Sequence, residues 1–195
     1  MNKLSYALGM SMASSLVNSG LKEVDVDEFA KGFAATIAGK GADMTPQEAN
    51  QHIQEFFSKR QEEMLTVNLE EGRKFLEENK QREGITALPS GLQYEIITEG
   101  DGPKPSATDR VKCHYHGTLI NGTVFDSSVQ RGEPAVFGVN QVIKGWVEAL
   151  QLMPVGSKWR LFIPTELGYG AQGAGGDIEP NSALIFEVEL LGIEK

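Results

Sequence analysis

Between residues 113 and 186 the chain carries aromatic residues at the ends of short segments, together with one acidic–basic pair. The aromatic residues are Tyr115, Phe125, Trp146, Tyr169 and Phe186, and the pair is Asp126 and Arg131. Apolar pockets form where such side chains converge at the ends of elements. Nothing in the stretch has the pattern of an activated nucleophile, a metal cage or a phosphate loop. These residues therefore predict a site that works by its shape and by excluding water.

Two patterns in this stretch admit other chemistry. Glycines at 168, 170 and 173 have the spacing of a dinucleotide-binding loop, but further glycines and Pro180 continue the loop where a helix should begin. Cys113, His114 and His116 suggest a metal site, yet alternate residues of a strand point to opposite faces, so Cys113 does not easily join the histidines. Both alternatives stay open, and we expect a site with no metal and no cofactor.

The composition is that of a soluble globular protein. The 195 residues are 40% hydrophobic and 23% charged, which leaves room for one large or two small domains. The net charge of −9 is shared between both halves, so no basic face predicts binding to nucleic acid or to an anionic membrane. No run of apolar residues is long enough to span a bilayer, and the single cysteine excludes an internal disulfide.

The first 84 residues have the periodicity of helices. Leu4, Leu8, Met12 and Leu16 are four residues apart, which predicts an amphipathic helix over about residues 2–18. A secretory signal following Lys3 is the alternative, but small polar residues interrupt its apolar run. A second helix is expected after Val26, with Asp27 as its N-cap and with Phe29, Phe33 and Ile37 on one side.

The third helix has the clearest beginning. Thr45, Pro46 and Glu48 have the spacing of a capping box, and no strong stop follows before Gly84. A helix over about residues 45–83 would be roughly 55 Å long, with Gly72 as its one weak point. Its first half is apolar, and two short helices have too little surface to cover it. We therefore expect a homodimer formed through the N-terminal helices; the alternative is a monomer whose helices fold onto the second domain.

Residues 85–195 change to short runs of alternating apolar and polar residues, which predict half-buried strands. One short helix is expected near residues 144–152. The predicted fold class is α+β: an N-terminal all-α dimerisation segment over residues 1–84, followed by an antiparallel β-sheet wrapped around one short helix over residues 85–195.

The second half also resembles a known family. The segments LPSGLQY (88–94), HYHG (114–117), GTVFDSS (122–128), VIKGW (142–146), YGA (169–171) and LIFEVELL (184–191) are similar, in order and spacing, to FKBP-type (tacrolimus-binding) peptidyl-prolyl cis-trans isomerases. KLSYALG (3–9) and the helices after it resemble the dimerising segment of the bacterial macrophage infectivity potentiator-like subgroup. The resemblance implies an enzyme that rotates X-Pro peptide bonds in folding proteins.

The family's site falls on particular residues of this chain. The resemblance implies catalytic roles for Tyr115, Phe125, Asp126, Trp146, Tyr169 and Phe186, and substrate-binding roles for Arg131, Ala135, Phe137, Val142, Ile143 and Ile178. Trp146 would form the floor, and the Ile143 N–H and the Tyr169 hydroxyl would hold substrate carbonyls. Isomerisation moves no proton, so Asp126 is expected to be an ionised wall residue paired with Arg131 and Tyr115. An ordinary turn aspartate is the alternative.

Two positions depart from the family pattern. Ala135 stands where many members have Phe, and Ala174 where some have His in the overhanging loop, which leaves substrate preference and inhibitor affinity open. The implied partners are proline-containing polypeptides, macrolides of the tacrolimus and rapamycin type, and a second copy of the chain, with chaperone-like binding by the dimer. The rival hypothesis is a module that binds proline peptides without turning them over. A cytoplasmic location is expected, with the periplasm as the alternative if the native N-terminus was processed.

Overall fold

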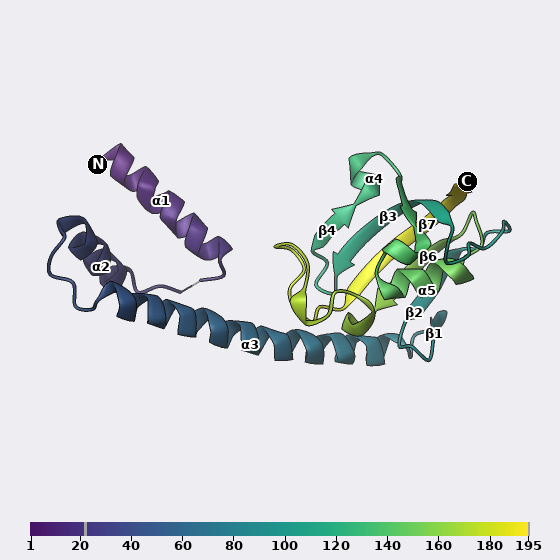
Figure 1. The fold of residues 1–195 in the computed structure, drawn as a ribbon, viewed down its shortest axis with the longest axis horizontal. Helices are drawn as coiled ribbons and strands as arrows, with labels where there is room; N and C mark the ends of the chain where they lie inside the picture. The colour runs from purple at the N-terminus through teal and green to yellow at the C-terminus, as the bar shows by residue number, and fades with distance from the viewer. Residues whose placement is uncertain (22, 195) are drawn as a thin grey trace. The chain divides into compact units, whose positions relative to one another are not determined.

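The computed structural model describes residues 1–21 and 23–194, in which helices precede an antiparallel sheet (Figure 1). The predicted α+β fold class is confirmed. The chain divides into two compact units, Met1–Phe56 and the remainder from Phe57 onward. This division falls inside the long helix and differs from the domain boundary at residue 84 that the sequence predicts. The boundary at residue 84 stays a prediction.

The first two helices begin at side-chain caps. Helix α1 (Lys3–Asn18) follows Asn2, whose side chain accepts hydrogen bonds from the first-turn amides. Helix α2 (Val26–Ala38) is capped by Asp25, so the prediction of Asp27 as the cap is wrong. The Asp25 carboxylate accepts from two amides of the first turn, one of them that of Asp27 itself, which is already helical. Within the described residues, no side chain of α1 or α2 is buried.

Helix α3 (Pro46–Asn79) opens with the predicted capping box. The Glu48 N–H donates to Thr45 Oγ1 at 3.2 Å, while the Thr45 N–H donates back to Glu48 Oε2 at 2.8 Å. The helix ends at Asn79, a turn earlier than expected. None of the described helices is both long enough and apolar enough to cross a membrane.

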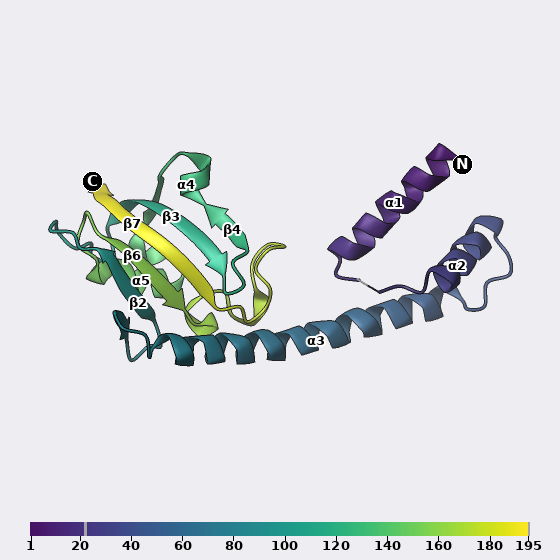
Figure 2. The same ribbon diagram turned by 180° about the vertical axis from the view of Figure 1, so that it is seen from behind.

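The second unit is built on a seven-stranded antiparallel sheet with strand order β1-β2-β6-β7-β3-β4, and β5 pairs with β3. Figure 2 labels β2, β6, β7, β3 and β4 of this sheet. The strands are β1 (Ile85–Ala87), β2 (Gln93–Thr98), β3 (Arg110–Leu119), β4 (Val124–Ser127), β5 (Ala135–Gly138), β6 (Lys158–Ile163) and β7 (Leu184–Glu194). Short helical turns lie between them: α4 (Ser128–Arg131) and the 3₁₀ turns at Val139–Gln141, Thr165–Leu167 and Gly170–Gln172. The predicted helix is present as α5 (Lys144–Leu152).

The core lies between α5 and one face of the sheet. Trp146, Ala149 and Leu150 of α5 are buried against Leu161 of β6 and Val188 of β7. The predicted alternation is present in β6 and β7, where every second side chain faces this core. The pocket described below is the open end of the same core.

The C-terminal half of α3 packs on the other side of the sheet. Phe75 lies 6.0 Å from the ring of Phe162, which is why Phe162 is buried although it alternates with the core residues of β6. Gly72 is also buried, and a Cβ there would lie 3.1 Å from the Cβ of Ala183. The glycine that weakens the isolated helix therefore permits its close approach to the sheet domain.

Candidate active site

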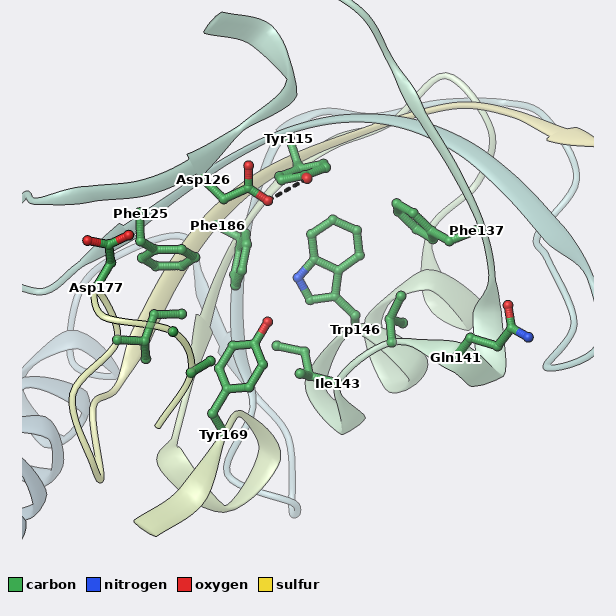
Figure 3. Close-up of a pocket in the computed structure, with 14 residues that line it drawn as sticks. Tyr115, Phe125, Asp126, Phe137, Gln141, Ile143, Trp146, Tyr169, Asp177 and Phe186 are labelled. Atoms are coloured by element: carbon green, nitrogen blue, oxygen red, sulfur yellow. Dashed lines mark hydrogen bonds between the residues drawn. The ribbon is translucent and has the colours of Figure 1, made fainter. Parts of the chain in front are cut away.

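A cavity of about 630 Å³ opens at the end of the core. This volume is in the range of pockets that take small ligands, ~300–1,000 Å³. The side chains around it come from β3, β4, β5, β7, α5 and two loops (Figure 3). They are Tyr115, Phe125, Asp126, Phe137, Gln141, Val142, Ile143, Trp146, Tyr169, Ala174, Gly175, Asp177, Ile178 and Phe186.

The indole of Trp146 forms the floor of this pocket. It is 4% exposed and is held edge-to-face by three rings at 5.2–5.5 Å. These rings belong to Tyr115, Phe137 and Phe186. Perpendicular packing of this kind places the positive edge of one ring on the negative face of another and fixes both. The pocket therefore has an apolar floor and rigid walls.

A glycine in β3 makes room for two of the walls. Gly117 pairs with Phe186 across β3 and β7, and a Cβ on Gly117 would lie 2.7 Å from the rings of both Phe125 and Phe186. The two rings are themselves in edge contact, with centroids 5.3 Å apart. Gly117 is part of the HYHG segment, but its position under the aromatic walls is visible only in the folded chain.

The rim of the pocket carries the acidic–basic pair. The Tyr115 hydroxyl donates to Asp126 Oδ2 at 2.6 Å, Arg131 Nη2 donates to the Tyr115 hydroxyl at 2.8 Å, and Arg131 Nη1 donates to Asp126 Oδ1. Ser127 caps the helical turn α4 and so places Arg131 one turn after Asp126. The guanidinium also lies 5.6 Å from the centroid of the Tyr115 ring.

This triad keeps Asp126 charged and Tyr115 neutral. Burial by itself raises the pKa of the Asp126 carboxyl, but the hydrogen bonds from Tyr115 and Arg131 outweigh it and leave that pKa below its ordinary value. Burial, followed by the bond to Asp126, raises the pKa of the Tyr115 hydroxyl. Burial and the charge of Asp126 raise the pKa of Tyr169 in the same way. At neutral pH none of the three groups is poised to exchange a proton.

Besides the indole N–H of Trp146, two donors of the residues lining the pocket have no internal partner in the described chain. Within residues 1–21 and 23–194, neither the Ile143 N–H nor the Tyr169 hydroxyl donates a hydrogen bond to another group of the chain. In Figure 3 the Tyr169 hydroxyl points toward the indole of Trp146, across the open part of the pocket. A ligand carbonyl seated over the indole would find one donor in the residue before α5 and the other in the loop between β6 and β7.

The predicted site residues converge, with two exceptions. Arg131 lies outside the pocket wall and acts on it through Asp126 and Tyr115, and Ala135 is a half-buried residue of β5, paired with Cys113 in β3, away from the lining. The structure adds Gln141, Gly175 and Asp177, which no motif marked. Gln141 and Asp177 lie on opposite sides of the pocket (Figure 3) and give it polar edges.

The two alternative patterns have other places in the fold. The Cys113 side chain is buried, and burial raises the pKa of its thiol to about 12. Nδ1 of His114 lies 3.1 Å from Ser128 Oγ, and Nδ1 of His116 lies 2.9 Å from Ser127 Oγ. The glycine-rich segment 168–173 forms a 3₁₀ turn and continues as a loop. The two histidines thus lie beside the serines that follow Asp126, and the glycines form part of the loop at the rim of the pocket.

The site is thus an apolar aromatic pocket at one end of an antiparallel sheet around one helix, with unpaired hydrogen-bond donors beside it. Comparison with known families identifies the class. Residues 102–191 match the model of FKBP-type peptidyl-prolyl cis-trans isomerases, and residues 1–96 match the domain found amino-terminal to them. The chain belongs to the FKBP-type peptidyl-prolyl cis-trans isomerase family and is an isomerase of X-Pro peptide bonds.

Individual relatives cover nearly the whole chain. It is 47% identical over 192 residues to the FKBP-type 22 kDa peptidyl-prolyl cis-trans isomerase of Escherichia coli K12, covering 97% of this chain and 93% of the relative. It is 42% identical to the outer membrane protein MIP of Legionella longbeachae, covering 100% of this chain and 86% of that protein. The crystal structure of FkpA from Escherichia coli superposes with a TM-score of 0.79 at 35% identity, covering 98% and 93% of the two chains. The resemblance stated from the sequence is confirmed.

Proposed function

We propose that the pocket over Trp146 is where this isomerase lowers the barrier, by taking the X-Pro amide out of water. The observation that carries the proposal is the apolar cavity itself, floored by an indole and walled by fixed aromatic rings. Its volume suits a proline ring together with the residues on either side of it.

Desolvation favours the transition state of this reaction. Rotation about the C–N bond breaks amide resonance and costs ~18–20 kcal/mol in the uncatalysed amide. The planar amide is more polar than the twisted one, so an apolar pocket destabilises the ground state more than the transition state. Each ~1.4 kcal/mol of that difference gives a tenfold rate increase.

The residues then have separate roles. The proline ring rests on Trp146, while the Ile143 N–H and the Tyr169 hydroxyl hold the carbonyls on either side of the rotating bond. Asp126 is not a general base in this scheme. Held by Tyr115 and Arg131, it fixes the ring of Tyr115 as a wall, and its charge at the rim of the pocket is paired with that of Arg131.

A refolding reaction limited by proline isomerisation tests these assignments in the full chain. Wild type should accelerate the slow phase, Trp146→Leu should lose most of the acceleration, and Asp126→Ala should lose part of it because Tyr115 and Arg131 are no longer held. Unchanged rates in both variants would refute the pocket assignment.

Isomerisation assays on short X-Pro peptides separate an enzyme from a module that only binds proline peptides. Such a module would show affinity for the peptides and no rate increase. Tacrolimus-type macrolides should compete with these peptides.

We further propose that the N-terminal helices pair with those of a second copy. The support is the absence of buried side chains in α1 and α2 among the described residues, although both helices carry regularly spaced apolar residues. On α2, Phe29, Phe33 and Ile37 are 40%, 47% and 75% exposed. Apolar faces of this extent are covered in stable proteins, and a second copy offers the matching faces.

Chaperone-like binding of unfolded clients by that dimer is a second proposal. It predicts that the full chain suppresses aggregation of a client whose folding is not limited by proline, and that macrolide in the pocket leaves this suppression intact. The cytoplasmic location also stays a prediction, which fractionation of the native cells would decide.

A further inference from the structure

The loop that overhangs the pocket has little regular structure of its own. This rim loop, residues 168–183, joins the 3₁₀ turn after β6 to the start of β7. It supplies Tyr169, Ala174, Gly175, Asp177 and Ile178 to the pocket lining. Internally it has one 3₁₀ turn, a two-bond bridge between Ala174 and Ile178, a bond from the Asn181 N–H to the Gly170 carbonyl, and a turn closed between Glu179 and Ser182. These few bonds shape the loop, and contacts with the rest of the domain set where it lies over the pocket.

The C-terminal half of α3 provides that fixation through two asparagines that donate in opposite directions. Asn68 of α3 donates from Nδ2 to the Pro180 carbonyl at 2.9 Å and to Glu179 Oε2 at 3.3 Å. Asn181 of the rim loop donates from Nδ2 to the Leu65 carbonyl of α3 at 2.9 Å. All five residues belong to the second compact unit. Helix and loop thus hold each other at two neighbouring points.

The residue types at the contact between α3 and the rim loop suit the backbone geometry found there. Asn181 has a φ of 59°, the one positive φ of a non-glycine residue among those described, and asparagine tolerates this conformation better than most residues. Its own N–H donates to the Gly170 carbonyl at 2.9 Å, directly after Tyr169. Gly72, one turn after Asn68, lets the helix approach the loop's end at Ala183. Asparagine and glycine both lower helix propensity, so their presence in α3 is explained by these contacts.

We propose that Asn68 and Asn181 are positioning residues of the isomerase site, through which helix α3 fixes the rim loop and sets the preference for residues flanking the proline. The proposal rests on the assignment of the pocket as the isomerase site. Asn181 ties Tyr169 to the helix through Gly170, and the Asn68 bond to Pro180 lies two residues from Ile178. Loss of either bond frees the loop, which weakens substrate binding before it affects the rotation over Trp146.

The test uses the full chain with one variant on each side of the contact. Asn68→Ala removes the helix donor at a position where alanine favours the helix, and Asn181→Gly removes the loop donor while keeping the left-handed backbone. Asn68→Asp places a carboxylate against the Pro180 carbonyl and the Glu179 carboxylate, so it should have a larger effect than alanine. Glu70→Ala, an exposed position of the same helix, is the matched control.

The readouts are kcat and KM for X-Pro peptides that differ in the residue before proline, and amide exchange of the rim loop. Asn68→Ala and Asn181→Gly should each raise KM about three- to tenfold, because one or two hydrogen bonds are lost. The factor should differ between the peptides, and kcat should change little. Exchange at Ala174 and Ile178 should be faster, and Glu70→Ala should match wild type. Wild-type KM values for every peptide in folded Asn68→Ala and Asn181→Gly would overturn the proposal.

The outcome is separable from that of the pocket assignment. If Trp146→Leu leaves catalysis intact, the pocket assignment fails. If Trp146→Leu is impaired while both asparagine variants retain the wild-type KM and amide exchange, the pocket assignment is supported. Only the positioning role of Asn68 and Asn181 is then refuted. Circular dichroism at the assay temperature establishes that each variant is folded.

Discussion

At the scale of residues, the site differs from most enzyme sites in what its charged group does. Asp126 lies at the rim of an apolar pocket, where a carboxylate with a raised pKa would suggest a proton carrier. Hydrogen bonds from Tyr115 and Arg131 lower its pKa instead, and burial raises those of Tyr115 and Tyr169. The arrangement holds rings in place, which agrees with the proposal that desolvation supplies the rate increase.

The activity should therefore not depend on pH near neutrality. From about pH 6 to 9, kcat/KM should be flat and unchanged in deuterium oxide, because Asp126 stays ionised and both tyrosines stay protonated over that range. A bell-shaped profile with a limb near pH 7, or a clear solvent isotope effect, would show that a proton moves in the rate-limiting step.

Acid should act on stability through the same carboxylate. The pKa of Asp126 is lower in the folded state than the ~3.9 of an unfolded chain, so its contribution is fully present above about pH 4 and is lost as pH falls through the folded value. Urea unfolding at pH 7, 4 and 3 should show a smaller acid loss in Asp126→Asn than in wild type. Equal losses would mean that the triad does not stabilise the fold.

At the scale of elements, the strands hold the aromatic walls at positions that depend on a glycine. Gly117→Ala should push Phe125 and Phe186 apart, destabilise the fold by about 1–3 kcal/mol and lower kcat/KM at least about tenfold. Gly192→Ala is the control, because a Cβ at that glycine of β7 meets nothing within 4 Å. Peptide isomerisation by the two folded variants compares them directly, and equal activities would contradict the role of Gly117.

The sequence predicts the helices and strands better than it predicts which of them pack against one another. The capping box of α3, helix α5 and the alternation of β6 and β7 follow from local patterns, and all are present. The burial of Phe162 and Gln93 does not follow from local patterns, because the C-terminal half of α3 covers both residues. There Asn79 donates to Gln93 Oε1 at 2.9 Å. Alternation alone cannot show that a strand is covered on both faces.

The site was predicted to a similar degree and for a similar reason. The aromatic residues belong to motifs with fixed spacing, so the resemblance carries each of them to a position in this chain. Gln141 and Asp177 lie in loops, where composition alone does not mark a pocket edge. The contacts of Asn68 and Asn181 join residues more than 110 positions apart, which only the folded chain brings together.

At the scale of the whole molecule, the proposed dimer explains why the N-terminal helices have apolar faces without a core. Ile37→Asp should shift the mass found by light scattering from dimer to monomer, because this side chain is 75% exposed in the single chain and would be covered in the pair. Val129→Asp is the control, since Val129 is 57% exposed on α4 of the isomerase unit. A monomeric wild-type protein, or a dimer that tolerates Ile37→Asp and not Val129→Asp, would contradict pairing through these helices.

The two tryptophans of the chain allow a test of whether the indole floor of the pocket is needed for catalysis. Trp146 forms the pocket floor, whereas Trp159 is equally buried but stacks on Tyr94, with ring centroids 4.3 Å apart, outside the pocket lining. The measurement is kcat/KM for cis-to-trans isomerisation of one X-Pro peptide, in a protease-free assay, by folded Trp146→Leu and Trp159→Leu. Loss of the indole floor should lower kcat/KM about tenfold or more, while Trp159→Leu should stay near wild type. Equal rates in the two variants, or a Trp146→Leu protein as fast as wild type, would contradict catalysis by the pocket.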